Sequence, residues 1–144
     1  MYRVAAIALG LISSAAGAAP VYLKCQLDYD SSSNKSQTHE LDLTLNEDTG
    51  TVTISFVGTS LADTVRGAFN ADKVTFKHDN LGYTADYNID RTNLALRESI
   101  LREADVSRIV AEGQTNAKAI LAEMDRSRII NNGKCTLVHV KRAF

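Results

Sequence analysis

Residues 21–28 read Val21-Tyr22-Leu23-Lys24-Cys25-Gln26-Leu27-Asp28, with apolar and polar side chains in strict alternation. A period of two is typical of a β-strand that has one buried face and one face in water. Cys25 lies on the apolar face, and the chain contains only one other cysteine, Cys135. In an oxidising compartment two cysteines are expected to form a disulfide. The pattern therefore predicts a first strand that is bonded through Cys25 to Cys135, near the other end of the chain.

The N-terminus has the three parts of a secretory signal peptide. One basic residue, Arg3, precedes an apolar run over residues 4–12, and small residues follow up to Ala18. We expect cleavage after Ala18, because cutting one residue later would place Pro20 directly after the scissile bond. The prediction is a signal peptide over residues 1–18.

The remaining chain, residues 19–144, has the length of one domain with a single hydrophobic core. No segment of it approaches the about 20 apolar residues that a transmembrane helix requires, so we predict no membrane span. The whole chain carries 16 Lys and Arg against 17 Asp and Glu and has no run of basic residues, so we also predict no nucleic-acid binding. The expected location is periplasmic or secreted.

Further alternating segments follow, separated by turns rich in Asp, Asn and Gly. We predict strands over residues 37–46, 51–58, 64–69, 73–78 and 83–90, and a last strand over residues 134–140. Strands at this short spacing are typical of an antiparallel meander that bends into a sandwich or a small barrel. The predicted fold class is mainly β, a small antiparallel meander barrel or sandwich.

Residues 97–131 differ from this pattern, since they contain no proline, one glycine and many Ala, Glu, Arg, Leu and Ile residues. We predict helices over about 97–112 and about 115–130, with Glu98 supported by Arg102 in the first. Asn131-Asn132-Gly133 would end the second. An alternative for the first segment is a strand prolonged through Leu94, Leu96 and Ile100.

The predicted helices form an insertion before the last strand that lies across an open end or flank of the barrel. The second helix carries an apolar stripe at helical spacing. The stripe consists of Ala117, Ile120, Leu121 and Met124. A lone amphipathic helix in a small domain ordinarily buries its stripe, so we expect it to pack on the sheet.

Two patterns of possible metal ligands are weak. Asp28, Asp30, Ser32 and Asn34 stand at every second position, as in a calcium loop, but Ser33 replaces the turn glycine and His39 replaces the bidentate glutamate. His39, His78 and His139 all fall in the inward phase of their strands, but strand counting places His139 at the opposite end from the other two. We predict no metal site and no cofactor.

Catalytic patterns are also weak. The chain has no Gly-x-Ser-x-Gly motif, and its serines cluster in residues 31–36. Asp86 and Asp90 share one strand face and resemble Asp42 in type, but outward carboxylates of strands ordinarily only face solvent. We predict that the protein is not an enzyme.

Three short motifs carry a resemblance to a group of proteins. They are Tyr-Asn-Ile-Asp-Arg-Thr-Asn-Leu at residues 87–94, Gly133-Lys134-Cys135, and the C-terminal Lys141-Arg142-Ala143-Phe144. With them the chain resembles short exported bacterial proteins of uncharacterised function that pair an early cysteine with a late one. The resemblance excludes residues 97–131 and implies no catalytic residue. In outline the chain is also similar to periplasmic lysozyme or protease inhibitors, which are small disulfide-clasped barrels.

The function predicted from these features is an exported, non-enzymatic binding module that engages a protein partner, with inhibition as one form of that role. The alternative is a calycin-like carrier of a small apolar ligand inside the barrel. Interior volume separates the two, and the large apolar side chains favour the binding module because they are sufficient to fill a small barrel. These are Leu41, Leu43, Leu45, Phe56, Phe69 and Phe76. We expect the function to lie in residues 29–36 or 97–131.

Overall fold

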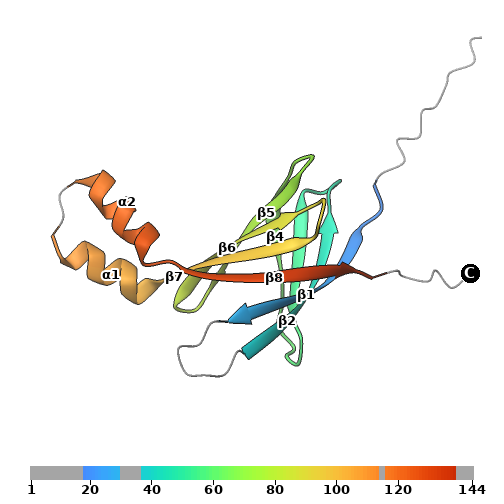
Figure 1. Cartoon of the computed structure of the whole chain (residues 1–144), viewed down its shortest axis with the longest axis horizontal. Helices are drawn as coiled ribbons and strands as arrows, with labels where there is room; N and C mark the ends of the chain where they lie inside the picture. The colour runs from blue at the N-terminus through green and yellow to red at the C-terminus, as the bar shows by residue number, and fades with distance from the viewer. Residues whose placement is uncertain (1–17, 30–36, 114–115, 139–144) are drawn as a thin grey trace, which may run out of the picture.

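The computed structural model describes residues 18–29, 37–113 and 116–138. Eight antiparallel strands in these residues form a closed barrel in which each strand pairs with the next and β8 pairs with β1 (Figure 1). The strands are β1 (Val21–Tyr29), β2 (Gln37–Asn46), β3 (Thr51–Phe56), β4 (Ala62–Phe69), β5 (Lys73–Asn80), β6 (Tyr83–Asp90), β7 (Ala95–Arg102) and β8 (Ile129–Leu137). Two helices, α1 (Glu103–Ala111) and α2 (Ala117–Arg126), lie between β7 and β8. The predicted meander with a helical insertion before the last strand is confirmed, and its form is a barrel.

Alternating side chains of the strands fill the barrel, as the period of two requires. Of the six side chains expected to fill it, Leu41, Leu43, Leu45 and Phe76 are buried. Phe56 and Phe69 are partly buried and pack against this core. The interior is therefore occupied by protein along most of its length.

Two interactions join the first and last strands: backbone pairing and a disulfide. Antiparallel pairing of β1 with β8 runs from Leu23 opposite Leu137 to Asp28 opposite Asn132, and Cys25 and Cys135 are register partners within it. The two cysteines form the predicted disulfide, which is buried in the core. The predicted signal peptide lies outside the described residues except for Ala18.

The first predicted helix is wrong over its N-terminal half. Residues 95–102 form β7, and α1 begins only at Glu103. The strand is favoured because its backbone pairs with β6 on one side and β8 on the other, while Leu96 enters the core. The alternative interpretation of this segment as a strand is confirmed for Leu96 and Ile100, whereas Leu94 lies in the turn before β7 and has a φ of +58°.

The predicted stop of the second helix is also wrong. Helix α2 ends at Arg126, and Asn131-Asn132-Gly133 lies inside β8, which begins five residues before the predicted last strand. Asn131 is a register partner of Glu98 on β7, so its amide is satisfied across the sheet instead of at a helix end. Val138 is described, and residues 139 and 140 of the predicted strand lie outside the described residues.

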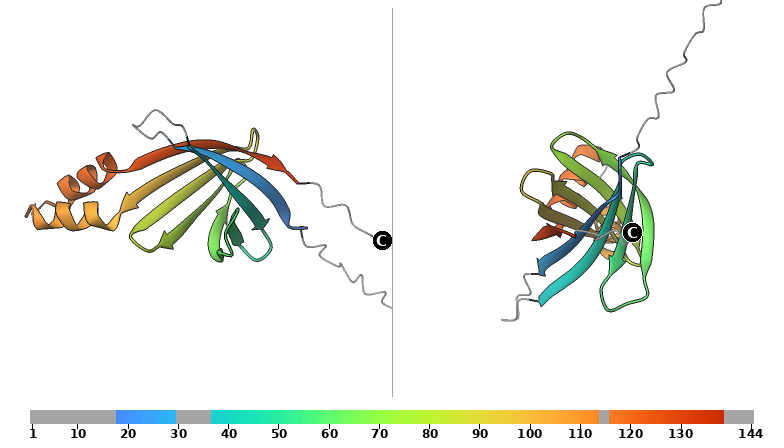
Figure 2. Two further views of the ribbon diagram at one scale, coloured as in Figure 1. Left: turned by 90° about the horizontal axis from the view of Figure 1, so that it is seen from below. Right: turned by 90° about the vertical axis from the view of Figure 1, so that its right-hand side faces the viewer.

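The helices α1 and α2, together named the helical arm, project beyond the strands of the barrel (Figures 1 and 2). They do not lie across an end or flank, and the predicted packing of the stripe on the sheet is wrong. No residue of α2 is buried, and Leu121 is 62% exposed. Neither helix is long and apolar enough to cross a membrane.

The arm leaves the barrel at the end where β7 stops and β8 starts, which is here named the arm end. Because the strands alternate in direction, β1, β3 and β5 also stop there, and β2, β4 and β6 start there. The backbone N–H of Glu103, the first residue of α1, donates to the carbonyl of Gly82 in the β5–β6 turn at 2.9 Å. The arm is thus attached directly beside the barrel mouth.

Candidate functional site

The arm end contains a pocket of about 560 Å³, within the usual size range of ligand sites. Aromatic rings from four strands contribute to its wall: Tyr29 of β1, His39 of β2, Phe56 of β3 and Tyr83 of β6. Among the described residues that line this arm-end pocket, none is a lysine or an arginine. The closed meander brings these rings together because Tyr29, Phe56 and Tyr83 are terminal residues of their strands at the same end of the barrel, and His39 lies near the start of β2 at that end.

Local contacts hold the pocket rings in place. The ring centroids of Tyr29 and His39 are 4.3 Å apart, at the open ends of the paired strands β1 and β2. The Tyr83 hydroxyl accepts a hydrogen bond from Asn80 Nδ2 at 3.0 Å across the tight β5–β6 turn. Phe56 lies against the imidazole of His78, with ring centroids 5.7 Å apart.

A buried polar row crosses the barrel wall near this pocket. Tyr87, Glu98 and Asn131 are successive register partners on β6, β7 and β8. Glu98 is only 2% exposed, and its carboxylate accepts one hydrogen bond from the Tyr87 hydroxyl and one from Asn131 Nδ2, both at 2.7 Å. No lysine or arginine of the described residues forms an ion pair with it. Glu98 is therefore a buried acid whose partners are all neutral.

Tyr29 connects the polar row to the arm-end pocket. Burial raises the pKa of the Tyr29 hydroxyl, and the nearby charge of Glu98 raises that pKa further. The pKa of Tyr87 is raised by the same causes, with burial the largest. Both hydroxyls therefore keep their protons at neutral pH, and the Tyr87 hydroxyl donates to the carboxylate at 2.7 Å. Tyr29 belongs at once to the pocket wall and to the surroundings of Glu98.

His78 lies in a part of the barrel wall, near the pocket, where the backbones of β4 and β5 are not paired. Strand β4 pairs with β5 only from Gly67 to Phe69, so the two strands separate toward the arm end. His78 is 5% exposed, and its Nε2 lies 3.4 Å from Asp63 Oδ2 on β4. Its Nδ1 is buried and has no hydrogen-bond partner in the described part of the chain. Side chains rather than a backbone ladder thus close the wall here.

The residues considered as metal ligands are dispersed. His39 and His78 both lie at the arm end, whereas His139 is outside the described residues. Of the calcium pattern, Asp30, Ser32 and Asn34 also lie outside them, and Asp28 accepts a hydrogen bond from the Thr38 hydroxyl at 3.4 Å. Over residues 18–29, 37–113 and 116–138 no three His, Cys, Asp or Glu side chains are grouped to hold a metal ion.

The outward carboxylates considered for catalysis have other partners. Asp86 accepts from Arg128 Nη1 at 2.8 Å and lies 3.6 Å from Lys77 Nζ. Asp90 accepts the backbone N–H groups of Thr92 and Asn93 in the turn after β6. These groups strengthen the outer wall and a turn, and they do not form a pair of acids.

The aromatic and polar side chains that line the arm-end pocket are of the kinds that recognise a ligand. Sequence reasoning missed Glu98 because a helical pairing with Arg102 was expected; Arg102 instead binds Asp105. The available signal was the period of two, which places Glu98 between Leu96 and Ile100 on the inward face.

Comparison of the chain with protein-family models, curated proteins and solved structures gives no match.

Proposed function

We propose that this protein is an exported, non-enzymatic binding module that engages a protein partner at the arm end of its barrel. The observation that carries the proposal is the helical arm, which stands clear of the barrel and exposes apolar side chains. An exposed apolar patch on a small domain ordinarily marks an interaction surface. A barrel needs no such projection to fold, because its own core is complete without it.

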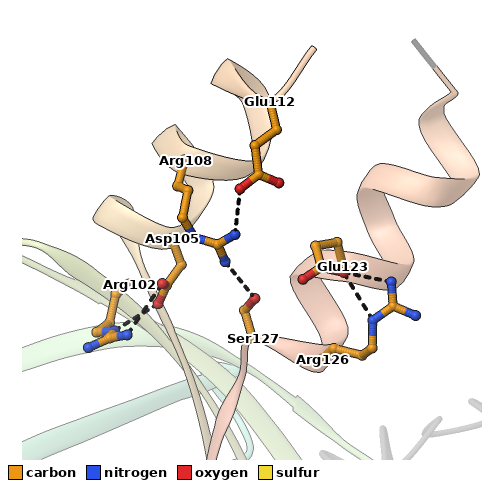
Figure 3. Close-up of polar contacts among 7 residues, drawn as sticks. All are labelled: Arg102, Asp105, Arg108, Glu112, Glu123, Arg126 and Ser127. Atoms are coloured by element: carbon orange, nitrogen blue, oxygen red, sulfur yellow. Dashed lines mark hydrogen bonds and ion pairs between the residues drawn. The ribbon is translucent and has the colours of Figure 1, made fainter. Parts of the chain in front are cut away.

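The arm is held in one shape by its own contacts, many of which are charged (Figure 3). Arg108 donates to Glu112 at 2.9 Å and also to the hydroxyl of Ser127, which joins α1 to the end of α2. Ile109 is fully buried but is separate from the barrel core. A surface that is ordered before binding loses less entropy when a partner docks, which supports a recognition role.

The arm and the adjoining start of β8 each expose some apolar side chains to solvent. Val110 is 60% exposed and Leu121 is 62% exposed, while Ile129 and Ile130 are exposed where β8 begins. Ion-paired residues lie on the same two helices, Arg108 with Glu112 and Arg126 with Glu123, and such groups are typical of the polar rim of an interface. Val110 and Leu121 are the arm residues that we assign to the partner, and inhibition of that partner is one role they could serve.

The buried disulfide supports export, because such bonds persist in oxidising compartments and are rare in the cytosol. A periplasmic or secreted location fits this chemistry. The resemblance to short exported bacterial proteins and the outline of periplasmic inhibitors agree with the same proposal.

Crosslinking capture from the exported fraction of the source cells tests the arm. We expect Val110→Asp with Leu121→Asp to reduce the captured partner at least about tenfold, since two charges would replace apolar interface contacts. Leu81→Asp is the matched control, because Leu81 is apolar and 96% exposed but lies in the β5–β6 turn. Capture that both variants leave equal to that of the unmodified protein would refute the proposal, as would no capture by any of the three.

The carrier is the second candidate, and an apolar pocket of about 310 Å³ at the opposite end of the barrel favours it. Leu23, Val74 and Ile89 contribute to its lining, and the Arg91–Glu47 ion pair borders it. Native mass spectrometry decides this candidate. The binding-module proposal predicts the mass of the bare chain, whereas a small molecule released on denaturation would establish the carrier.

A further inference from the structure

We propose that the protein partner contributes an extended segment, which adds as a strand to the open edge of β4 and places a side chain in the arm-end pocket. The open edge of β4 is residues 62–66, which have no backbone pair on β5. This inference rests on the proposed function, because it names the form in which the partner binds. It uses a surface separate from the exposed residues of the helical arm, so the two can be tested apart.

The backbone of the open edge is paired on one side only, with β3. The N–H of Gly67 donates to the carbonyl of Gly50 on the β3 side. Successive residues of a strand direct their N–H and C=O groups to opposite sides, so the residues of β4 with even numbers direct theirs toward β5. Those of the open edge are Ala62, Thr64 and Arg66, and none of them pairs with β5. Such a row of backbone groups is a template for another strand.

An extended peptide is the occupant that this edge fits. Its own N–H and C=O groups point to one side at every second residue, which is the spacing of the three edge residues. A segment of about five residues is long enough to pair with all three. In strand addition of this kind the main-chain hydrogen bonds supply affinity, and pockets for alternate side chains supply specificity. The proposal therefore needs a pocket beside the edge as well as the edge itself.

The arm-end pocket is that pocket, because the gap between β4 and β5 opens into it. The turn before β4 contributes Val57 and Leu61 to the pocket lining, and the turn after β5 contributes Asn80 and Tyr83. Leu61 directly precedes the open edge and is 62% exposed, so a side chain of an added strand can cover it. The turn after β5 also accepts the backbone N–H of Glu103, the first residue of the arm. The edge, the pocket and the arm thus lie at one end of the barrel.

The contacts that now close the gap are ones that an incoming strand can replace. Asp63 Oδ1 accepts the backbone N–H of Thr64 at 2.8 Å, and Asp63 Oδ2 lies 3.4 Å from Nε2 of His78. The Asp63 side chain is 56% exposed, and exposed contacts of this kind contribute little to stability. The buried Nδ1 of His78 has no hydrogen-bond partner in the described part of the chain. Asp63 can therefore turn into solvent and release the edge N–H of Thr64.

The test uses a phage-displayed library of random peptides of about 12 residues, selected on the full exported chain. Arg66→Pro removes one N–H of the open edge and spares the pairing with β3, because the N–H of residue 66 does not face β3. Arg66→Ala is the matched control, since it removes the same side chain and keeps the N–H. We expect selected peptides to bind Arg66→Ala like the natural protein and Arg66→Pro at least about tenfold more weakly. No enriched peptide, or equal binding to the two variants, would overturn the proposal.

Amide hydrogen exchange, followed by NMR, tests the edge even when Arg66→Pro does not fold. In the natural protein the N–H of Arg66 should exchange at least about a hundredfold faster than that of Ala68, which lies where β4 and β5 are paired. Saturation with a selected peptide should slow exchange at Arg66 at least about tenfold. An Arg66 N–H that is already protected in the free protein would contradict an open edge. Protection that is lost on dilution would assign the edge to a second copy of the chain instead.

The same variants connect the edge to the partner. In the crosslinking capture described above, Arg66→Pro should reduce the captured partner at least about tenfold relative to Arg66→Ala. Undiminished capture by Arg66→Pro would mean that the partner does not use this edge. Val110→Asp with Leu121→Asp should leave binding of the selected peptides unchanged, because these residues lie on the arm. Failure of the arm proposal and failure of the edge proposal are therefore distinguishable.

Discussion

Reduction of the Cys25–Cys135 disulfide is expected to lower the free energy of unfolding by about 4 to 5 kcal/mol. The bond spans 110 residues, so in the chain-entropy model its loss frees a very large loop in the unfolded chain. The folded barrel loses little, because β1 and β8 remain paired by their backbones on both sides of the two cysteines. The loss is a large share of the about 5 to 15 kcal/mol that stabilises a typical domain.

Urea unfolding of the oxidised and the reduced protein, followed by circular dichroism, measures this difference. With a slope of about 2 kcal/mol per molar urea, the midpoint should fall by about 2 M on reduction. The double variant Cys25→Ala with Cys135→Ala is the control, since its midpoint should not respond to reductant. A shift smaller than about 0.5 M in the natural protein would contradict the view that the disulfide holds the seam.

Much of the barrel was predictable because most inward positions are apolar. In β2 the inward Leu41, Leu43 and Leu45 alternate with polar residues, and the period of two fixes both the strand and its buried face. The two cysteines then identified the seam, because a chain with only two offers a single pairing. Turn residues indicated where one strand ends and the next begins. Gly50, for example, has a φ of +62° where the β2–β3 hairpin reverses.

The candidate site was not predictable by the same rule, because it is built from exceptions to it. Glu98 and Asn131 occupy inward positions that the pattern expects to be apolar, so β7 resembled a helix and the start of β8 resembled a helix stop. Each polar group is acceptable only because the other lies opposite it, and that pairing exists only after β7 and β8 have come together. A local sequence pattern does not contain information about a hydrogen-bond partner 33 residues away.

The helical arm shows a different limit of sequence reasoning. The stripe of α2 was correctly recognised as helical, but its spacing says nothing about which surface covers it. A second short helix, α1, provides that surface: Ile109 is buried within the arm, and Ile120 and Met124 of α2 are partly buried. Leu121 falls outside this contact and remains exposed, which makes it available for the partner proposed above.

Gly133→Ala is expected to destabilise the barrel by about 3 kcal/mol, although it adds a single methyl group. Gly133 lies in β8 between Leu27 of β1 and Leu96 of β7, its register partners. An added Cβ would overlap the backbone carbonyl of Gln26 and would lie 3.0 Å from the Cα of Leu27. Backbone atoms in a paired strand cannot swing aside as a flexible side chain can, so β1 and β8 would have to move apart.

The same seam therefore depends on a glycine as well as on the disulfide, and the two effects are separable. Lys134→Ala, at the next and exposed position of β8, is the matched control and should change stability by less than about 0.5 kcal/mol. Urea unfolding of both variants with the disulfide intact gives the comparison, because the crosslink then constrains the unfolded chain equally in each. A Gly133→Ala protein as stable as Lys134→Ala would mean that β1 and β8 tolerate wider spacing here, and that the glycine is not needed for their close approach.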